Sequence, residues 1–146
     1  MRRFRFRLAK VLDARRARER SSEARLLATR LALSRAIGAE EHTGQRMRAS
    51  RARLETMLAG PLQLAEIEWE GEHLLALGAL AAFRREQTRA AERRVHQALD
   101  ELLSARRERK MLERLSERQF AQHQSLALRQ EMLEIEDCFR MRRSAV

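Results

Sequence analysis

The chain of 146 residues has little of what a thick globular core requires. It contains one Pro, five Gly and no Tyr, and only 4% of its residues are aromatic, whereas 36% are charged. A globular domain of this length normally has more large aromatic side chains and more turn residues. Abundant Ala, Leu, Glu and Arg with almost no helix breakers is instead typical of long helices that bury narrow apolar stripes.

The sequence also has few cysteines and no long apolar run. Cys138 is the single cysteine, so no disulfide framework forms within one chain, as expected in a reducing cytoplasm. The longest apolar run, residues 74–83, is too short to span a bilayer. No apolar segment follows the charged N-terminus, so no secretory signal is expected. We therefore expect a cytoplasmic protein.

Patterns typical of enzymes and metal sites are missing. The four histidines are 23 or more residues apart, and none shares a helical turn with Cys138, so the spacing of a local metal site is absent. There is no Gly-rich phosphate loop and no nucleophile elbow. Two packed helices also lack the concavity of an active site. We expect a non-enzymatic protein without catalytic residues, metal, cofactor or small-molecule substrate.

One strong break divides the chain. Gly60-Pro61 is the pair expected where one helix stops and the next begins. We expect an all-α fold, a long two-helix antiparallel coiled coil with its turn near Gly60-Pro61. The helices should cover about residues 4–58 and 63–140, on either side of a turn at 59–62, in a single domain of residues 1–146.

Apolar residues recur with helical spacing on both predicted helices. No heptad register continues along the whole chain, because Arg and Gln fall at candidate contact positions, so we expect an imperfect coiled coil. The expected stripe of the first helix includes Phe4, Leu8, Val11, Leu12, Ala24, Leu27, Ala28 and Leu31. That of the second includes Leu64, Ile67, Leu74, Leu75, Leu99, Leu102, Leu112, Leu115, Leu128, Met132, Ile135 and Phe139.

Folding the chain at the turn pairs residue i with roughly residue 122 − i. This register places Gly44 opposite Gly78, where the two backbones could approach closely. It places Phe4 near Arg118 and leaves about 25 residues of the second helix extending past the first. The pairing could also form between two chains, so the sequence leaves a dimer open.

Charge is unevenly distributed, with a formal net charge of +10. Residues 1–60 hold 16 Lys or Arg and 6 Asp or Glu; residues 61–80 hold no basic residue and four Glu; residues 81–146 hold 15 basic and 11 acidic residues. The N-terminal arginines have few acidic neighbours in the sequence. We therefore expect this cluster to repel itself or to meet an acidic partner.

The aromatic residues near the N-terminus have different expected roles. Phe4 continues the stripe of Leu8 and Leu12, so we expect it in the core. Phe6 lies elsewhere around the helix, either as frayed surface or as a partner contact. Alternating Phe and Arg side chains would also suit a nucleic-acid groove, which keeps a polyanion-binding alternative open.

Trp69 shares a helical row with His73 and Leu77, facing away from the expected stripe. Two interpretations remain open. The indole could fold back and cover the turn, or it could be an exposed binding anchor on an acidic rim.

Three segments resemble the FliJ family, small rod-like proteins of the bacterial flagellar protein export apparatus. "FRFRLAKVLDARRARE" (residues 4–19) looks like the family's aromatic-basic-aromatic opening and leucine helix. "ARRERKMLERLSERQ" (residues 105–119) looks like its mixed-charge segment with two leucines, and "GPLQLAEIEWEGEHLLAL" (residues 60–77) is similar to its turn. The resemblance spans nearly the whole chain, although each motif is low in complexity.

The resemblance implies a two-helix stalk whose terminal segments enter the pore of a hexameric export ATPase and promote its assembly and activity. It implies a turn end that contacts the export gate, a membrane protein, as well as binding of export chaperones and a cytoplasmic location peripheral to the inner membrane. The implied ring-binding residues are Phe4, Arg5, Leu8, Leu12, Arg107, Arg109, Leu112 and Leu115. By position and expected exposure, the gate-binding residues are Trp69, His73 and Leu77.

Three alternatives stay open beside this stalk hypothesis. The chain also resembles the stalk proteins of injectisome type III secretion systems. A basic coiled coil could bind nucleic acid or another polyanion, but the arginines of the first helix are not gathered on one face and no known binding motif is present, so we do not expect nucleic acid as the partner. A self-associating structural coiled coil is the third alternative.

Overall fold

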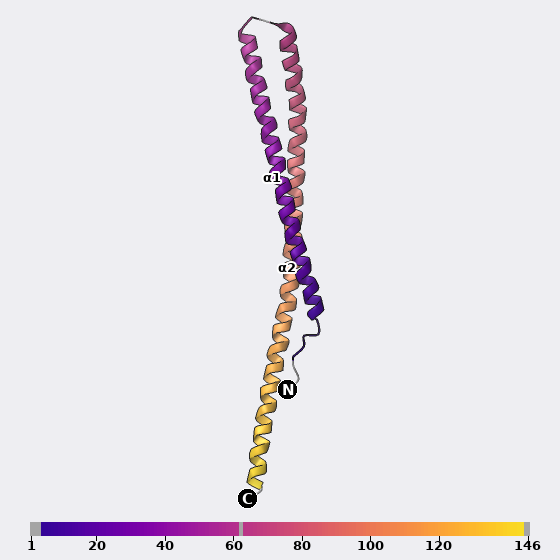
Figure 1. Ribbon diagram of the computed structural model, residues 1–146, viewed down its shortest axis with the longest axis vertical. Helices are drawn as coiled ribbons and strands as arrows, with labels where there is room; N and C mark the ends of the chain where they lie inside the picture. The colour runs from indigo at the N-terminus through magenta and orange to yellow at the C-terminus, as the bar shows by residue number, and fades with distance from the viewer. Residues whose placement is uncertain (1–3, 62, 145–146) are drawn as a thin grey trace. The chain divides into compact units, whose positions relative to one another are not determined.

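The computed structural model describes residues 4–61 and 63–144. It is all-α, with two long helices, α1 (Ala9–Ala59) and α2 (Leu64–Ser144), that run antiparallel and pack against each other on either side of a turn near residue 62 (Figure 1). The predicted two-helix antiparallel coiled coil is confirmed. The chain forms two compact units. We call residues 22–102 the turn unit, and residues 1–21 together with 103–146 the terminal unit.

The helix ends follow from local chemistry. α1 begins at Ala9, five residues after the expected start near residue 4, and the amide of Ala9 donates to the carbonyl of Phe6 at 3.2 Å. The first turn of α1 has no acidic residue, and nearby Arg5, Arg7 and Lys10 disfavour the positive end of a helix dipole. α2 begins three residues after Pro61 and has Glu66 in its first turn, where a carboxylate is favourable.

In the turn unit, the buried face of each helix follows one heptad register. Positions separated alternately by three and four residues are all buried or half-buried, as in a coiled coil. On α1 these positions are Ser22, Leu26, Thr29, Leu33, Ala36, Glu40, Thr43, Met47, Ser50, Leu54 and Met57. On α2 they are Ile67, Glu70, Leu74, Leu77, Ala81, Arg84, Thr88, Ala91, Val95, Ala98 and Leu102. We call these positions the seam.

A heptad register therefore holds within this unit, although the sequence predicts none along the whole chain. Polar residues at seam positions do not interrupt the register. The threonine hydroxyl groups, for example, donate hydrogen bonds to backbone carbonyls of their own helix. Thr43 donates to the carbonyl of Ala39 at 2.9 Å, and Thr88 donates to that of Arg84 at 3.1 Å. A threonine that is satisfied in this way can be buried at modest cost.

The seam also corrects the expected apolar stripes. Leu26 is only 6% exposed and packs with Ala98 and Leu102, whereas Leu27, which we placed on the stripe, is 67% exposed. Leu75 and Leu64 are likewise exposed instead of buried. Adjacent leucines are equally hydrophobic, so only the heptad register decides which of them contacts the other helix.

In the terminal unit, the seam continues as Leu12, Arg15 and Glu19 on α1. On α2 it continues as Ala105, Arg109, Leu112, Ser116, Gln119 and His123. Phe4 is half-buried and its ring meets that of Phe120 edge-on at a centroid distance of 5.3 Å, with His123 at 5.5 Å. Phe6 is also half-buried. Every described side chain from residue 128 to residue 142 is exposed.

The pairing register is close to the expected one but shifted. The residue numbers of the Ser50–Glu70 pair sum to 120 and those of the Arg16–Glu113 pair to 129, compared with the expected 122. The ring of Phe4 accordingly meets those of Phe120 and His123. The predicted close approach of Gly44 and Gly78 is wrong, because a Cβ atom at Gly78 would meet nothing within 4 Å.

Neither helix, over the residues described, has a stretch long and apolar enough to cross a membrane.

Candidate partner-binding surfaces

Ion pairs across the terminal unit engage the arginines near the start of α1. Arg15 and Arg18 both donate to the Oε2 atom of Glu108, at 2.5 and 3.1 Å, and Arg16 donates to Glu113 at 3.2 Å. In the opposite direction, Arg106 of α2 donates to Glu19 of α1 at 3.3 Å. Part of the arginine cluster thus meets acidic residues, which α2 supplies, and does not need a separate acidic partner.

Arg109 is the most enclosed arginine of this network. It lies at a seam position and its guanidinium donates to both Glu19 and Glu113. Hydrogen bonding to Glu19, together with the charge of Glu113, raises the pKa of Arg109 above its ordinary value. The side chain is 22% exposed, so this residue holds the two helices together more than it presents a free charge.

The proposed ring-binding residues divide into two groups. Leu12 is buried and Arg109 is paired, and Leu112 is half-buried, so these three belong mainly to the helix contact. The exposed residues of the set are Arg5, Leu8, Arg107 and Leu115. Phe4 and Leu12 line one groove together with Phe120. Sequence reasoning missed Phe120, and an aromatic side chain about level with Phe4 in the paired register was the signal that could have identified it.

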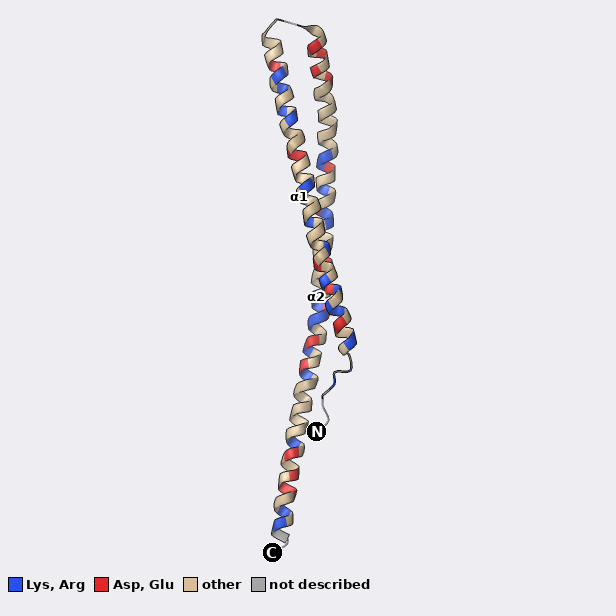
Figure 2. Ribbon diagram, in the orientation of Figure 1, with Lys and Arg blue, Asp and Glu red and all other residues tan. Residues whose placement is uncertain are grey.

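Near the turn, the two helices carry charges of opposite sign. Acidic residues gather on the first turns of α2, while the last turns of α1 carry mostly arginine (Figure 2). Glu66, Glu68 and Glu72 are exposed, whereas Glu70 is 1% exposed. The exposed acidic rim therefore consists of three glutamates, and the fourth belongs to the helix contact.

Glu70 is held by α1. Ser50, also fully buried, donates its hydroxyl to the Oε1 atom of Glu70, and Arg53 donates to the same oxygen at 3.0 Å. The bond from Ser50 and then that from Arg53 lower the pKa of Glu70 below its ordinary value, against the effect of burial. This buried polar cluster fixes the register of the helices next to the turn.

Glu70→Gln should make the protein less stable at pH 7 and less sensitive to acid. A carboxyl whose pKa is lowered by folding stabilises the fold above its ordinary pKa, and this stability is lost as the pH falls through the folded value. The difference in thermal midpoint between wild type and variant should therefore narrow below about pH 4.5. Thermal unfolding followed by circular dichroism at pH 7 and at lower pH measures it. Glu68→Gln, at an exposed neighbour, is the control, and an equal response of both variants would contradict the assignment.

Trp69 lies beside this cluster. The indole is 63% exposed and stacks on the imidazole of His73, with ring centroids 5.5 Å apart and planes at 4°. Trp69 therefore does not cover the turn. Leu77 departs from the expected surface row, because it is 3% exposed at a seam position. The surface that can meet a partner here is the Trp69–His73 stack with the acidic rim.

The part of the chain that the structure describes contains no candidate metal site. No group of three or more His, Cys, Asp and Glu side chains lies close enough together there to hold an ion.

The fold defines the class of protein, a two-helix antiparallel coiled-coil hairpin. Comparisons with protein-family models, with curated proteins and with solved structures find no match for this chain.

Proposed function

We propose that this protein is a non-enzymatic stalk component of the bacterial flagellar protein export apparatus. In this role it binds the hexameric export ATPase, promotes its assembly and activity, and links it to the export gate and to export chaperones at the inner membrane. The observation that carries the proposal is the presence, on a two-helix hairpin, of two chemically different exposed surfaces. One is basic and apolar in the terminal unit, and the other is aromatic and acidic in the turn unit.

The terminal surface suits an acidic, apolar-lined pore. Leu8 and Leu115 are each 37% exposed, and Arg5 and Arg107 of the same unit are also exposed. Arginines of this kind steer a partner of opposite charge and orient it, while apolar side chains contribute to the bound state. Leu12 and Arg109 act indirectly in this proposal, by holding the two helices together.

The turn surface suits a different partner. A stacked Trp69–His73 pair offers a large, rigid aromatic area beside three exposed glutamates. Aromatic residues of this kind are common anchors in protein interfaces. We assign this surface to the export gate, and Leu77 to support of the helix from inside the seam.

The test is the ATP hydrolysis rate of the cognate export ATPase, titrated with this protein at physiological salt. We expect a saturable rise in rate. The double variant Leu8→Asp/Leu115→Asp should require at least about tenfold more protein for half of the effect, because charges would replace the exposed apolar contacts. Leu75→Asp, at an exposed leucine of the turn unit, is the matched control and should behave as wild type.

A flat rate with a competent ATPase would overturn the stalk proposal. If the rate of the flagellar export ATPase stays flat but that of an injectisome ATPase rises, the protein belongs to that related system. Strong binding to nucleic acid that falls steeply with salt would instead favour the polyanion alternative. Pairing of Arg15, Arg16 and Arg18 with glutamates of α2 counts against that alternative, because it neutralises part of the basic cluster.

A further inference from the structure

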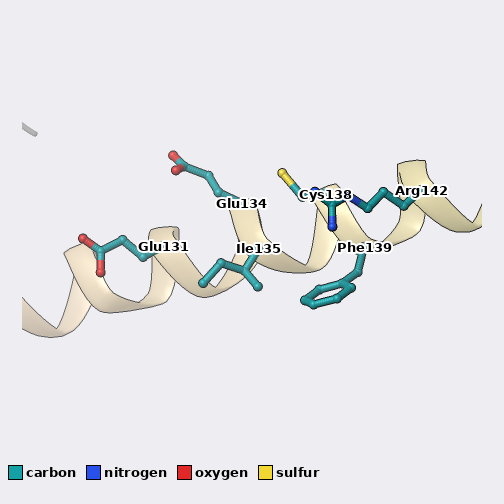
Figure 3. Close-up of a pocket in the computed structure, with 6 residues that line it drawn as sticks. All are labelled: Glu131, Glu134, Ile135, Cys138, Phe139 and Arg142. Atoms are coloured by element: carbon teal, nitrogen blue, oxygen red, sulfur yellow. The ribbon is translucent and has the colours of Figure 1, made fainter.

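A stripe of four large apolar side chains lies on the last part of α2. Leu128, Met132, Ile135 and Phe139 follow each other at intervals of four, three and four residues, which places them on one helix face. Each is between 55% and 67% exposed. Ile135 and Phe139 project from the same side of the helix, with Glu131 and Arg142 lining the same shallow groove (Figure 3). We call these four residues the C-terminal stripe.

The C-terminal stripe is not a continuation of the seam. Steps of seven from the seam positions His123 and Gln119 reach residues 130 and 126, then 137 and 133. The stripe residues fall between these numbers, on a face about 160° around the helix from the seam. Our expectation that these four residues belong to the core stripe is therefore wrong. Their regular heptad spacing on a second face is what a second coiled-coil partner would require.

The charges beside the stripe argue against a lipid surface as that partner. Residues 128–142 contain three arginines and four acidic residues. A helix that lies on an anionic membrane normally has an excess of Lys and Arg on its polar face. A protein helix is the better match for a nearly neutral polar face.

The flanking charges are complementary to a second copy in one orientation. In heptad terms, Arg129 and Glu136 flank one side of the stripe, and Glu131 and Cys138 flank the other. If two copies pair antiparallel, residues on the same side face each other, so Arg129 of each chain meets Glu136 of the other. If they pair parallel, opposite sides meet, and Glu131 of each chain faces Glu136 of the other. Antiparallel pairing thus gives two attractive contacts where parallel pairing gives two repulsive ones.

We propose that this segment is a homodimerisation surface, in which the C-terminal stripes of two copies pair antiparallel. Met132 then packs against Ile135 of the partner subunit, and Leu128 packs against Phe139 of the partner subunit, so that the contact is symmetric about the centre of the stripe. Four apolar layers form a small interface, so the dimer is weak, with a dissociation constant on the order of 10 μM. This inference does not depend on the proposed export function.

The test is sedimentation equilibrium of the full chain at concentrations from about 1 to about 200 μM. Wild type should change from monomer to dimer across this range. Met132→Asp/Ile135→Asp should remain largely monomeric, with association weakened at least about a hundredfold, because the central layers would bury charges. Leu75→Asp/Phe83→Asp, at exposed apolar residues of the turn unit, is the control and should dimerise as wild type. Circular dichroism confirms that each variant retains its helix content.

Charge reversal tests the orientation. Glu136→Arg should weaken the dimer several-fold, because it would face Arg129 of the partner subunit, and Arg129→Glu/Glu136→Arg should restore it. In a parallel dimer Glu136→Arg would instead strengthen association. The proposal is overturned if the wild type is monomeric at the highest concentration, if the stripe variant still dimerises, or if Glu136→Arg tightens the dimer.

Discussion

Leu26→Ala should lower the free energy of unfolding by about 2–3 kcal/mol, whereas Leu27→Ala should change it by less than about 0.5 kcal/mol. The two leucines are adjacent and chemically identical, but Leu26 is 6% exposed and Leu27 is 67% exposed. Truncating Leu26 removes an apolar side chain from the cluster that contains Ala98 and Leu102 and leaves a cavity there. Truncating Leu27 removes atoms that are mostly in water already.

Urea unfolding followed by circular dichroism measures both variants. All samples need the same low chain concentration, so that self-association does not add to the apparent stability. Because the substitutions are the same and one residue apart, Leu27→Ala controls for the change in helix propensity. A loss of stability at Leu27 as large as that at Leu26 would show that the heptad register assigned to α1 is wrong.

The triple variant Gly38→Ala/Gly71→Ala/Gly78→Ala should be more stable than the wild type by about 1.5–3 kcal/mol. All three glycines lie inside helices with negative φ angles, where glycine costs conformational entropy. A Cβ atom at any of them would meet nothing within 4 Å, so alanine adds no clash. Each substitution should contribute about 0.5–1 kcal/mol, because alanine restricts the unfolded chain.

Differential scanning calorimetry should detect a higher melting temperature. The single variant Gly78→Ala distinguishes the observed packing of the helices from the packing expected from the sequence. A close approach of the backbones at Gly44 and Gly78 would make that variant less stable, whereas open space makes it more stable. A lower melting temperature for Gly78→Ala would therefore contradict the spacing of the two helices in the turn unit.

The helices and their turn could be predicted because their signals are local. Gly60-Pro61 is the strongest helix break in the sequence, and α1 ends at Ala59 immediately before it. The same local reasoning failed at the N-terminus, where helical spacing of Phe4 and Leu8 suggested a start that the basic residues disfavour. A periodic pattern states which face a residue would occupy, but not whether the helix extends to it.

The buried faces could not be predicted because they depend on contacts between distant residues. A stripe of leucines that included Leu27 was the natural choice from hydrophobicity alone, but the seam runs through Thr29, Glu40, Thr43 and Ser50 instead. Thr29 and Thr43 bond to carbonyls of their own helix. Ser50 and Glu40 instead depend on partners that no local window contains, which are Glu70 and Arg85. The surface row at the turn failed for the same reason, since Leu77 is a seam residue and only Trp69 and His73 remain at the surface.

The hydroxyl groups of Thr43 and Thr88 are satisfied within their own helices. Moving the two helices apart at these positions breaks no hydrogen bond made by either hydroxyl group, and between the two threonines the helices are joined by a loose ion pair of Arg85 and Glu40 at 3.9 Å. These hydrogen bonds therefore remain intact if the two helices separate at Thr43 and Thr88 without unfolding. Next to the turn the opposite holds, because parting the helices would break the bonds from Ser50 and Arg53 to Glu70. Polar contacts between the helices are therefore weaker in the middle of the turn unit than next to its turn.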